Sequence, residues 1–219
     1  TIGKVAELAS GYQGWIGAWK QFGADKFMGS DEEIGEAVKK WRRESPKIVG
    51  FWKNIEATVI KAIKTPEFIY LVESPYVTLN VGVVDDVLYI RLPSGRFLSY
   101  HEPEVYVGER FEKPVDKIRY MGYEAVTSSW VPHDLYGGIL TENIVQAIAR
   151  DVLCYAMLNL EKAGYTITMH VHDEIIAEVL ENFGSIEEFE KIMATYPDWC
   201  KDWPLKAAGG WRDKRYRKD

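Results

Sequence analysis

The sequence predicts an α+β fold: a helical region, a small antiparallel β region, and a final part that joins a long helix to an acid-tipped β-hairpin. Residues 1–65 carry helical patterns with capping residues between them, and residues 66–125 carry short runs rich in β-branched and aromatic side chains. Residues 126–219 return to a long helical pattern. The chain shows no internal repeat and no low-complexity linker, so we expect the three regions to pack together.

Three helices are expected in the first region, over residues 2–19, 31–43 and 46–64. The first contains no proline, although Gly11, Gly14 and Gly17 weaken its far end. Ser30 or Asp31 caps the second helix, and Pro46 lies in the first turn of the third, where an N–H has no helical partner.

The second region is expected to form short antiparallel strands over residues 68–72, 76–84, 87–92 and 97–100. Residues 84–87 and 93–96 supply the turns, because each contains aspartate, proline or glycine between two apolar runs.

The third region begins with a predicted helix over residues 138–162, whose apolar positions recur mostly at intervals of three and four. Two strands follow, over residues 165–171 and 175–180, and a helix over residues 186–193 precedes a tryptophan-rich tail. His172, Asp173 and Glu174 are expected at the tip of the hairpin.

Two consecutive acids at a hairpin tip are a candidate metal site. An isolated acidic turn is ordinarily a solvated one. Here the turn follows a long helix and a strand, which together form a scaffold that can aim a carboxylate. We therefore interpret Asp173 as a metal ligand, with the solvated turn as the structural alternative.

A second constellation lies near the start of the chain. Lys4, Leu8 and Tyr12 are spaced by four, so a helix would align a cation, an apolar side chain and an aromatic ring on one face. Phosphate, sugar and base follow the same order in a nucleotide, because lysine holds phosphate and tyrosine stacks on a base. The alternative is an ordinary amphipathic helix.

The composition is that of a globular chain, with 47% hydrophobic residues. No run approaches the ~18 apolar residues of a membrane span, and no secretory leader opens the chain, so we expect no membrane partner and a cytoplasmic location. Cys154 and Cys200 show no metal-binding spacing and are expected to be reduced thiols.

The net charge of −6 argues against general coating of DNA, so phosphate contacts must come from local basic runs. The candidates are residues 39–43 and 212–218, and a solvated helix face is the alternative for both. The eight tryptophans are interpreted mainly as core or interface residues.

Four segments, collinear along nearly the whole chain, together resemble the second half of a phage-type family A DNA polymerase, the group of bacterial DNA polymerase I. They are GKVAELASGYQG at residues 3–14, LPSGR at 92–96, YGG at 136–138 with ENIVQAIARD at 142–151, and VHDE at 171–174. The resemblance implies template-directed DNA synthesis from dNTPs on a DNA primer–template, in the cytoplasm of a bacterial or phage-infected cell. It also implies that residues 1–65 are part of the fingers, that residues 126–219 are part of the palm, and that residues 66–125 are a β-rich insertion.

The first segment resembles motif B, the nucleotide-binding helix of this family. The resemblance implies that Lys4 is a catalytic residue that holds the triphosphate, that Leu8 lies beside the sugar and base, and that Tyr12 lies at the templating position. Many relatives have phenylalanine or tyrosine where this chain has Leu8, so altered handling of the sugar is implied.

The VHDE segment resembles motif C. The resemblance implies that Asp173 is the catalytic carboxylate that binds Mg²⁺, that Glu174 is an accessory metal ligand, and that His172 lies near the primer end. Gln146 matches a DNA-binding glutamine of the palm, and either Glu142 or Asn143 takes the neighbouring polar role.

Nucleotidyl transfer by this route uses two divalent ions about 3.5–4 Å apart, and one carboxylate cannot hold both. The family's other essential aspartate lies in motif A, which precedes motif B, and no segment here resembles it. We therefore expect this chain to hold half of a metal site and to need an N-terminal polymerase fragment that carries motif A. We favour a naturally split enzyme with a larger partner. A truncated product and an interrupted gene also fit, and Thr1 does not distinguish the three.

Two other functions remain open. The first is a non-catalytic DNA-binding remnant of a polymerase. The second is a metal-dependent hydrolase built around His170, His172 and Asp173, which is less favoured because the chain has no HExxH segment.

Overall fold

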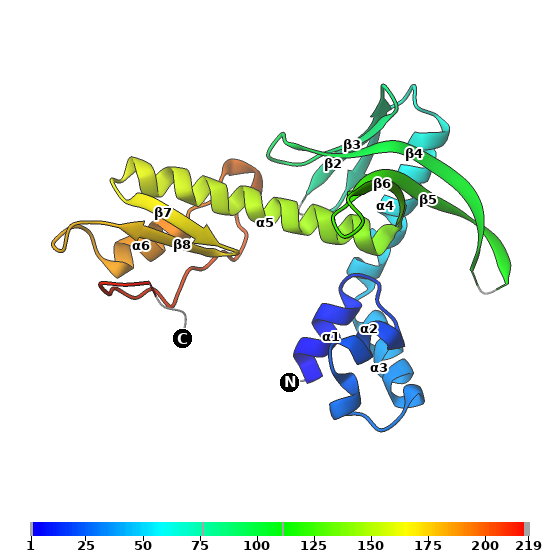
Figure 1. The fold of residues 1–219 in the computed structure, drawn as a ribbon, viewed down its shortest axis with the longest axis horizontal. Coiled ribbons are helices and arrows are strands. Elements are labelled where there is room, and N and C mark those ends of the chain that lie inside the picture. The colour runs from blue at the N-terminus through cyan, green and yellow to red at the C-terminus, as the bar shows by residue number, and fades with distance from the viewer. Residues whose placement is uncertain (1, 76, 111, 217–219) are drawn as a thin grey trace. The chain divides into compact units, whose positions relative to one another are not determined.

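The computed structural model describes residues 2–75, 77–110 and 112–216, and its helices and antiparallel strands confirm the α+β fold class. Four residues used in the sequence-based predictions lie outside the described residues: Thr1, Tyr76, Arg217 and Lys218. The chain divides into two compact units, Thr1–Val145 and Gln146–Asp219, and the boundary falls inside helix α5 (Gly137–Lys162). Figure 1 labels α5 and most of the other helices and strands.

The first unit begins with helices. They are α1 (Ile2–Ser10), α2 (Ile16–Gln21), the 3-10 helix η1 (Ala24–Lys26), α3 (Asp31–Glu44) and α4 (Pro46–Lys64). The second and third predicted helices are confirmed as α3 and α4. Ser30 caps α3, because its Oγ accepts a hydrogen bond from the Glu33 N–H at 3.3 Å, and Pro46 is the first residue of α4.

The prediction of one helix over residues 2–19 is wrong, because α1 ends at Ser10 and a new helix starts at Ile16. Gln13, in the turn between them, has a left-handed φ of 69°. A Cβ at Gly14 would lie 2.1 Å from the Ala9 carbonyl oxygen, so glycine lets the chain pass directly against the end of α1.

The rest of the first unit is a six-stranded antiparallel sheet, with strands in sequence order (Figure 1). They are β1 (Tyr70–Glu73), β2 (Thr78–Val84), β3 (Val87–Arg91), β4 (Phe97–Arg110), β5 (Lys113–Glu124) and β6 (Ser129–Leu135). Asp85 and Asp86 form the predicted tight turn between β2 and β3, both with positive φ.

The sheet is larger than the sequence indicates. β4 continues ten residues past Tyr100, and β5 and β6 were not predicted as strands. β4 passes Pro103 through a bulge between His101 and Glu104, where Glu102 has a φ of 48°. Pro132 is tolerated because β6 is an edge strand. The sheet therefore extends to Leu135, beyond residue 125, and the three-region division stays a prediction.

Helix α4 packs on one face of this sheet. Ile55, Val59 and Ala62 of α4 are fully buried. Their counterparts in the sheet are also fully buried: Val72, Leu79, Val81, Leu88 and Ile90. Burial of each large aliphatic side chain stabilises the fold by roughly 1.5–3 kcal/mol. The helices before α4 enclose a separate cluster, whose buried members are Val5, Ala9, Trp19, Ala24, Ile34 and Val38.

The second unit holds most of α5 and the predicted hairpin and helix, which are confirmed as β7 (Thr166–Val171), β8 (Glu174–Glu178) and α6 (Ile186–Met193). A short 3-10 helix, η2 (Asp198–Cys200), follows. Cys154 and Cys200 are free thiols. Among the described residues, no helix has both the length and the apolarity that crossing a membrane requires.

Candidate functional site

Lys4 and Leu8 lie on the exposed face of α1. Val5 and Ala9, each the next residue along α1 and so directed to a different side of the helix, are buried in the helical cluster; the amphipathic pattern of α1 therefore fixes which side points outward. Lys4 is exposed and Leu8 is 42% exposed. Because the two residues are one turn apart, a ligand can contact a cation and an apolar surface together.

Tyr12 does not extend this row along the helix, because it lies in the turn after α1. Its ring is half-buried. Burial, together with the negative charge of nearby Glu142, raises the pKa of the Tyr12 phenol. Burial and Glu142 also raise the pKa of Tyr136, so both rings lie close to the first turns of α5.

The start of α5 is fixed by contacts with the earlier helices. The Gly138 N–H donates to Gln13 Oε1 at 2.9 Å, and the Gly137 N–H donates to Glu56 Oε2 at 3.0 Å. These side chains satisfy N–H groups that have no partner within the helix. The turn that carries Tyr12 is therefore bound directly to the first turn of α5.

Asn143, a predicted DNA-binding residue, donates from Nδ2 to the hydroxyl of Tyr100 at 3.0 Å. Tyr100 lies in β4 and is only 4% exposed, and its burial raises the pKa of its phenol. The Asn143 amide is thus engaged inside the first unit, while Glu142 is the residue that influences Tyr12. A DNA-binding role for Asn143 stays a prediction.

The acidic tip is a two-residue turn, because Val171 pairs with Glu174 and only His172 and Asp173 lie between the strands. Glu174 is the first residue of β8, not part of the turn as predicted. The Asp173 side chain is 87% exposed, and its Oδ1 lies 3.4 Å from Nδ1 of His172, which is 92% exposed. His172 has a left-handed φ of 54°, a conformation that the paired strands impose on the turn.

Glu174 contacts the C-terminal segment. The Tyr216 hydroxyl donates to Glu174 Oε2 at 3.0 Å, and this hydrogen bond raises the pKa of Tyr216. Trp211 stacks on Tyr216 with ring centroids 6.1 Å apart. Arg212 Nη2 donates to the carbonyl oxygens of Leu180 and Phe183 at 3.1 and 2.7 Å. The two acids therefore differ: Asp173 faces solvent, and Glu174 has a phenol donor.

A hydrolase centre built on the two histidines is not assembled. His170, in β7, lies against the guanidinium of Arg150, with nitrogen–nitrogen distances of 3.2 and 3.4 Å, whereas His172 lies in the turn. In the part of the chain that the structure describes, no three His, Cys, Asp or Glu side chains are grouped to hold a metal ion. The carboxylates of Asp173 and Glu174 offer hard oxygen ligands of the kind Mg²⁺ requires, but they form only part of such a site.

The basic runs are partly used for internal contacts. Arg42 donates from Nη2 to the carbonyl oxygens of Gln13 and Gly14, and Lys39 pairs with Glu36 at 2.8 Å. Arg212 binds two carbonyl oxygens in the same way as Arg42. A charge count cannot identify such roles, since they depend on contacts between distant parts of the sequence.

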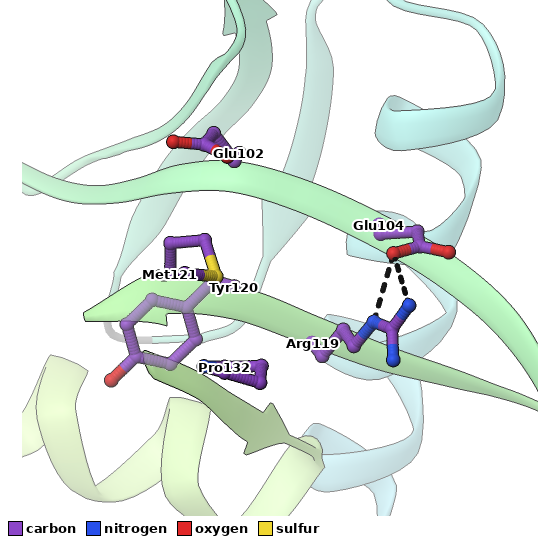
Figure 2. A pocket seen from close by; sticks show the side chains of 6 residues that line it. All are labelled: Glu102, Glu104, Arg119, Tyr120, Met121 and Pro132. Carbon is purple, nitrogen blue, oxygen red and sulfur yellow. Dashed lines mark hydrogen bonds and ion pairs between the residues drawn. The ribbon is translucent and has the colours of Figure 1, made fainter. Parts of the chain in front are cut away.

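Figure 2 shows a pocket at the β4 bulge. Its lining residues are Glu102, Glu104, Arg119, Tyr120, Met121 and Pro132. Arg119 binds Glu104 through Nε at 2.8 Å and Nη2 at 2.7 Å. Because its cation and one carboxylate neutralise each other, this pocket does not resemble a catalytic centre.

The predicted site residues fall into two groups. Lys4, Leu8, Tyr12 and Asn143 belong to the first unit, and Gln146, His172, Asp173 and Glu174 belong to the second. Gln146 is exposed on α5. Sequence analysis missed the supporting side chains of Arg42 and Tyr216, whose only signal was membership of a basic run.

A DNA polymerase of Bacillus phage SP02 is 41% identical to the chain over 217 residues, which cover 99% of this chain and 32% of that polymerase. The chain thus spans about a third of the length of this relative. No protein-family model matches the chain, and no solved structure matches it. Over almost its whole length, the chain is similar to part of a phage DNA polymerase.

Proposed function

We propose that the chain supplies part of the polymerase region of a family A DNA polymerase, which transfers a nucleotidyl group from a dNTP to a primer 3′-hydroxyl on a DNA template. The main support is the exposed Asp173 carboxylate, held at a two-residue turn in a chain that is 41% identical to a phage DNA polymerase segment. The reaction would take place in the cytoplasm of a bacterial or phage-infected cell.

The face of α1 would bind the incoming nucleotide. Lys4 is an exposed cation suited to the triphosphate, and Leu8 offers an apolar surface for the sugar one turn away. Tyr12 would lie at the templating base, where its half-buried ring can stack. The ring's position is fixed by the turn and not by α1 itself.

The Asp173 carboxylate, with Glu174 beside it, would hold Mg²⁺. When bound, the two ions would lower the pKa of the primer hydroxyl and neutralise the triphosphate. Tyr216 holds Glu174 by a hydrogen bond, so Asp173 is the more accessible ligand. A second essential carboxylate would come from polymerase residues beyond these 219, either in one longer polypeptide or in a separate fragment.

The test is primer extension with Mg²⁺ by this chain alone and by this chain mixed with the part of the SP02 polymerase that lies outside the region of similarity. We expect extension only in the mixture, and we expect Asp173→Asn to abolish it. Glu178→Gln is the matched control, because Glu178 is an exposed acid at the other end of β8 and its loss should leave extension unchanged.

Binding of Mn²⁺, followed by electron paramagnetic resonance, gives a second readout. The affinity for Mn²⁺ should fall in Asp173→Asn and stay unchanged in Glu178→Gln. Robust extension by the isolated chain would show that the second carboxylate is not needed. A mixture that binds primer–template but does not extend it would instead favour the non-catalytic remnant.

A further inference from the structure

The turn that carries Tyr12 is held by donors from three other elements. Arg42 of α3 donates from Nη2 to the carbonyl oxygens of Gln13 and Gly14, both at 3.1 Å. Trp52 of α4 donates from Nε1 to the Gly11 carbonyl oxygen at 2.9 Å. Together with the hydrogen bond from the Gly138 N–H to Gln13 Oε1, these contacts join the turn to α3, α4 and α5.

The Arg42 guanidinium lies between two indole rings. Its central carbon is 5.0 Å from the centroid of the Trp15 ring and 5.7 Å from that of Trp52. Trp41 stacks on Trp52, with the two ring centroids 6.1 Å apart and an interplanar angle of 11°. A planar cation between aromatic faces is favourable, and a guanidinium fits this arrangement better than an ammonium.

Local backbone bonding alone does not explain the conformation of the turn. Within it, the Gly11 N–H donates to the Glu7 carbonyl oxygen, and the Gln13 N–H donates to the Ser10 carbonyl oxygen. Gln13 nevertheless adopts a left-handed φ, which is unfavourable for a residue with a side chain. Such a conformation persists when the surroundings impose it, and Arg42 contacts the carbonyl of that same residue.

We propose that Arg42 is a positioning residue that fixes the Gly11–Gly14 turn and thereby the place of the Tyr12 ring at the templating base. The effect on the templating base rests on the proposed function of Tyr12. The role of Arg42 in fixing the turn does not depend on that function. Lysine cannot replace Arg42, because one ammonium lacks the plane that fills the space between the indoles.

The first test uses the isolated chain and amide hydrogen exchange. Arg42→Lys should make the amides of Gly11 and Gln13 exchange about tenfold faster, because it weakens the charge-assisted hydrogen bonds that hold the turn. The matched control is Arg43→Lys, on the exposed side of α3, which should exchange as the wild type does. Amides of β2 and β3 report whether each variant is folded. Unchanged exchange in a folded Arg42→Lys would overturn the proposal.

The second test measures the KM for the dNTP in the reconstituted polymerase. Arg42→Lys should raise KM by about tenfold, whereas in a Tyr12→Ala background the same change should alter KM less than about twofold, since coupled residues are non-additive. Additive effects of the two substitutions on KM would mean that Arg42 does not act through Tyr12. If the wild-type mixture extends no primer, the proposed function fails, while hydrogen exchange still decides whether Arg42 holds the turn.

Discussion

Gly138→Ala tests how closely α5 meets the turn that carries Tyr12. A Cβ at residue 138 would lie 2.2 Å from the Tyr12 carbonyl oxygen and 2.7 Å from Gln13 Cβ. The Tyr12 carbonyl oxygen is a backbone atom, so a change of side-chain rotamer cannot relieve this contact. Either the turn or the helix must move. Movement of either one breaks the 2.9 Å hydrogen bond from the residue 138 N–H to Gln13 Oε1.

The expected loss of stability follows from these contacts. Overpacking costs roughly 1–3 kcal/mol, and loss of the hydrogen bond costs about 1 kcal/mol. The higher helix propensity of alanine offsets about 0.5–1 kcal/mol of this loss of stability. We therefore expect the free energy of unfolding to fall by about 2 kcal/mol.

Gly50→Ala is the matched control, since Gly50 lies within α4 and a Cβ there meets no atom within 4 Å. It should stabilise the protein by about 0.5–1 kcal/mol. Urea denaturation followed by tryptophan fluorescence measures both variants, and the Gly138→Ala midpoint should shift down by about 1 M. A Gly138→Ala protein at least as stable as the wild type would refute the close approach of helix and turn.

Two further predictions concern single side chains. Leu8→Phe should change discrimination between deoxy- and dideoxynucleotides by roughly tenfold in the reconstituted enzyme. Leu8 is 42% exposed, so the substitution should leave folding unaffected. Unchanged discrimination would show that Leu8 does not lie beside the sugar. Burial raises the pKa of Tyr100, so the folded state keeps this proton to higher pH than the unfolded state does. The resulting stability is complete below pH ~10 and is lost as pH rises through the folded pKa. Tyr100→Phe should therefore flatten the alkaline fall of the unfolding free energy, and equal slopes in both proteins would contradict this.

Elements whose ends are set by nearby residues were predictable from the sequence. Ser30 caps α3 and Pro46 opens α4, and each acts within one turn of the helix that it starts. The hairpin of β7 and β8 was likewise evident, because its β-branched runs flank the turn directly. Local signals therefore located these elements almost to the residue.

Elements whose form depends on distant contacts were not predictable. The end of α1 reflects the close approach of Gly14 to Ala9 and the bonds from Arg42 and Trp52, which lie about 30 and 40 residues further along the chain. Strand β4 passes Pro103 only because its partner strand accommodates a bulge. The strand predicted over residues 97–100 ended before Pro103, and a proline inside a strand is unfavourable away from edges and bulges.

The candidate site divides in the same way. Asp173, at a local turn, could be located from sequence alone, whereas the hydrogen bond from Tyr216 to Glu174 spans 42 residues and had no local signal. The structure therefore adds to the sequence mainly the side chains that hold the proposed functional groups in place.

The geometry of the hairpin tip also bears on the proposed second carboxylate. Asp173 is 87% exposed, so water competes with any cation that its carboxylate binds. A lone solvated carboxylate holds Mg²⁺ weakly, because this ion dehydrates reluctantly and is usually held by one or two carboxylates together with substrate phosphates. Tight binding at Asp173 therefore requires that a triphosphate and another acid approach the turn, which excludes water and strengthens each charge interaction. On this reasoning, Mn²⁺ affinity of the isolated chain should rise little when dNTP is added, and it should rise strongly when the segment with the second acid is added as well.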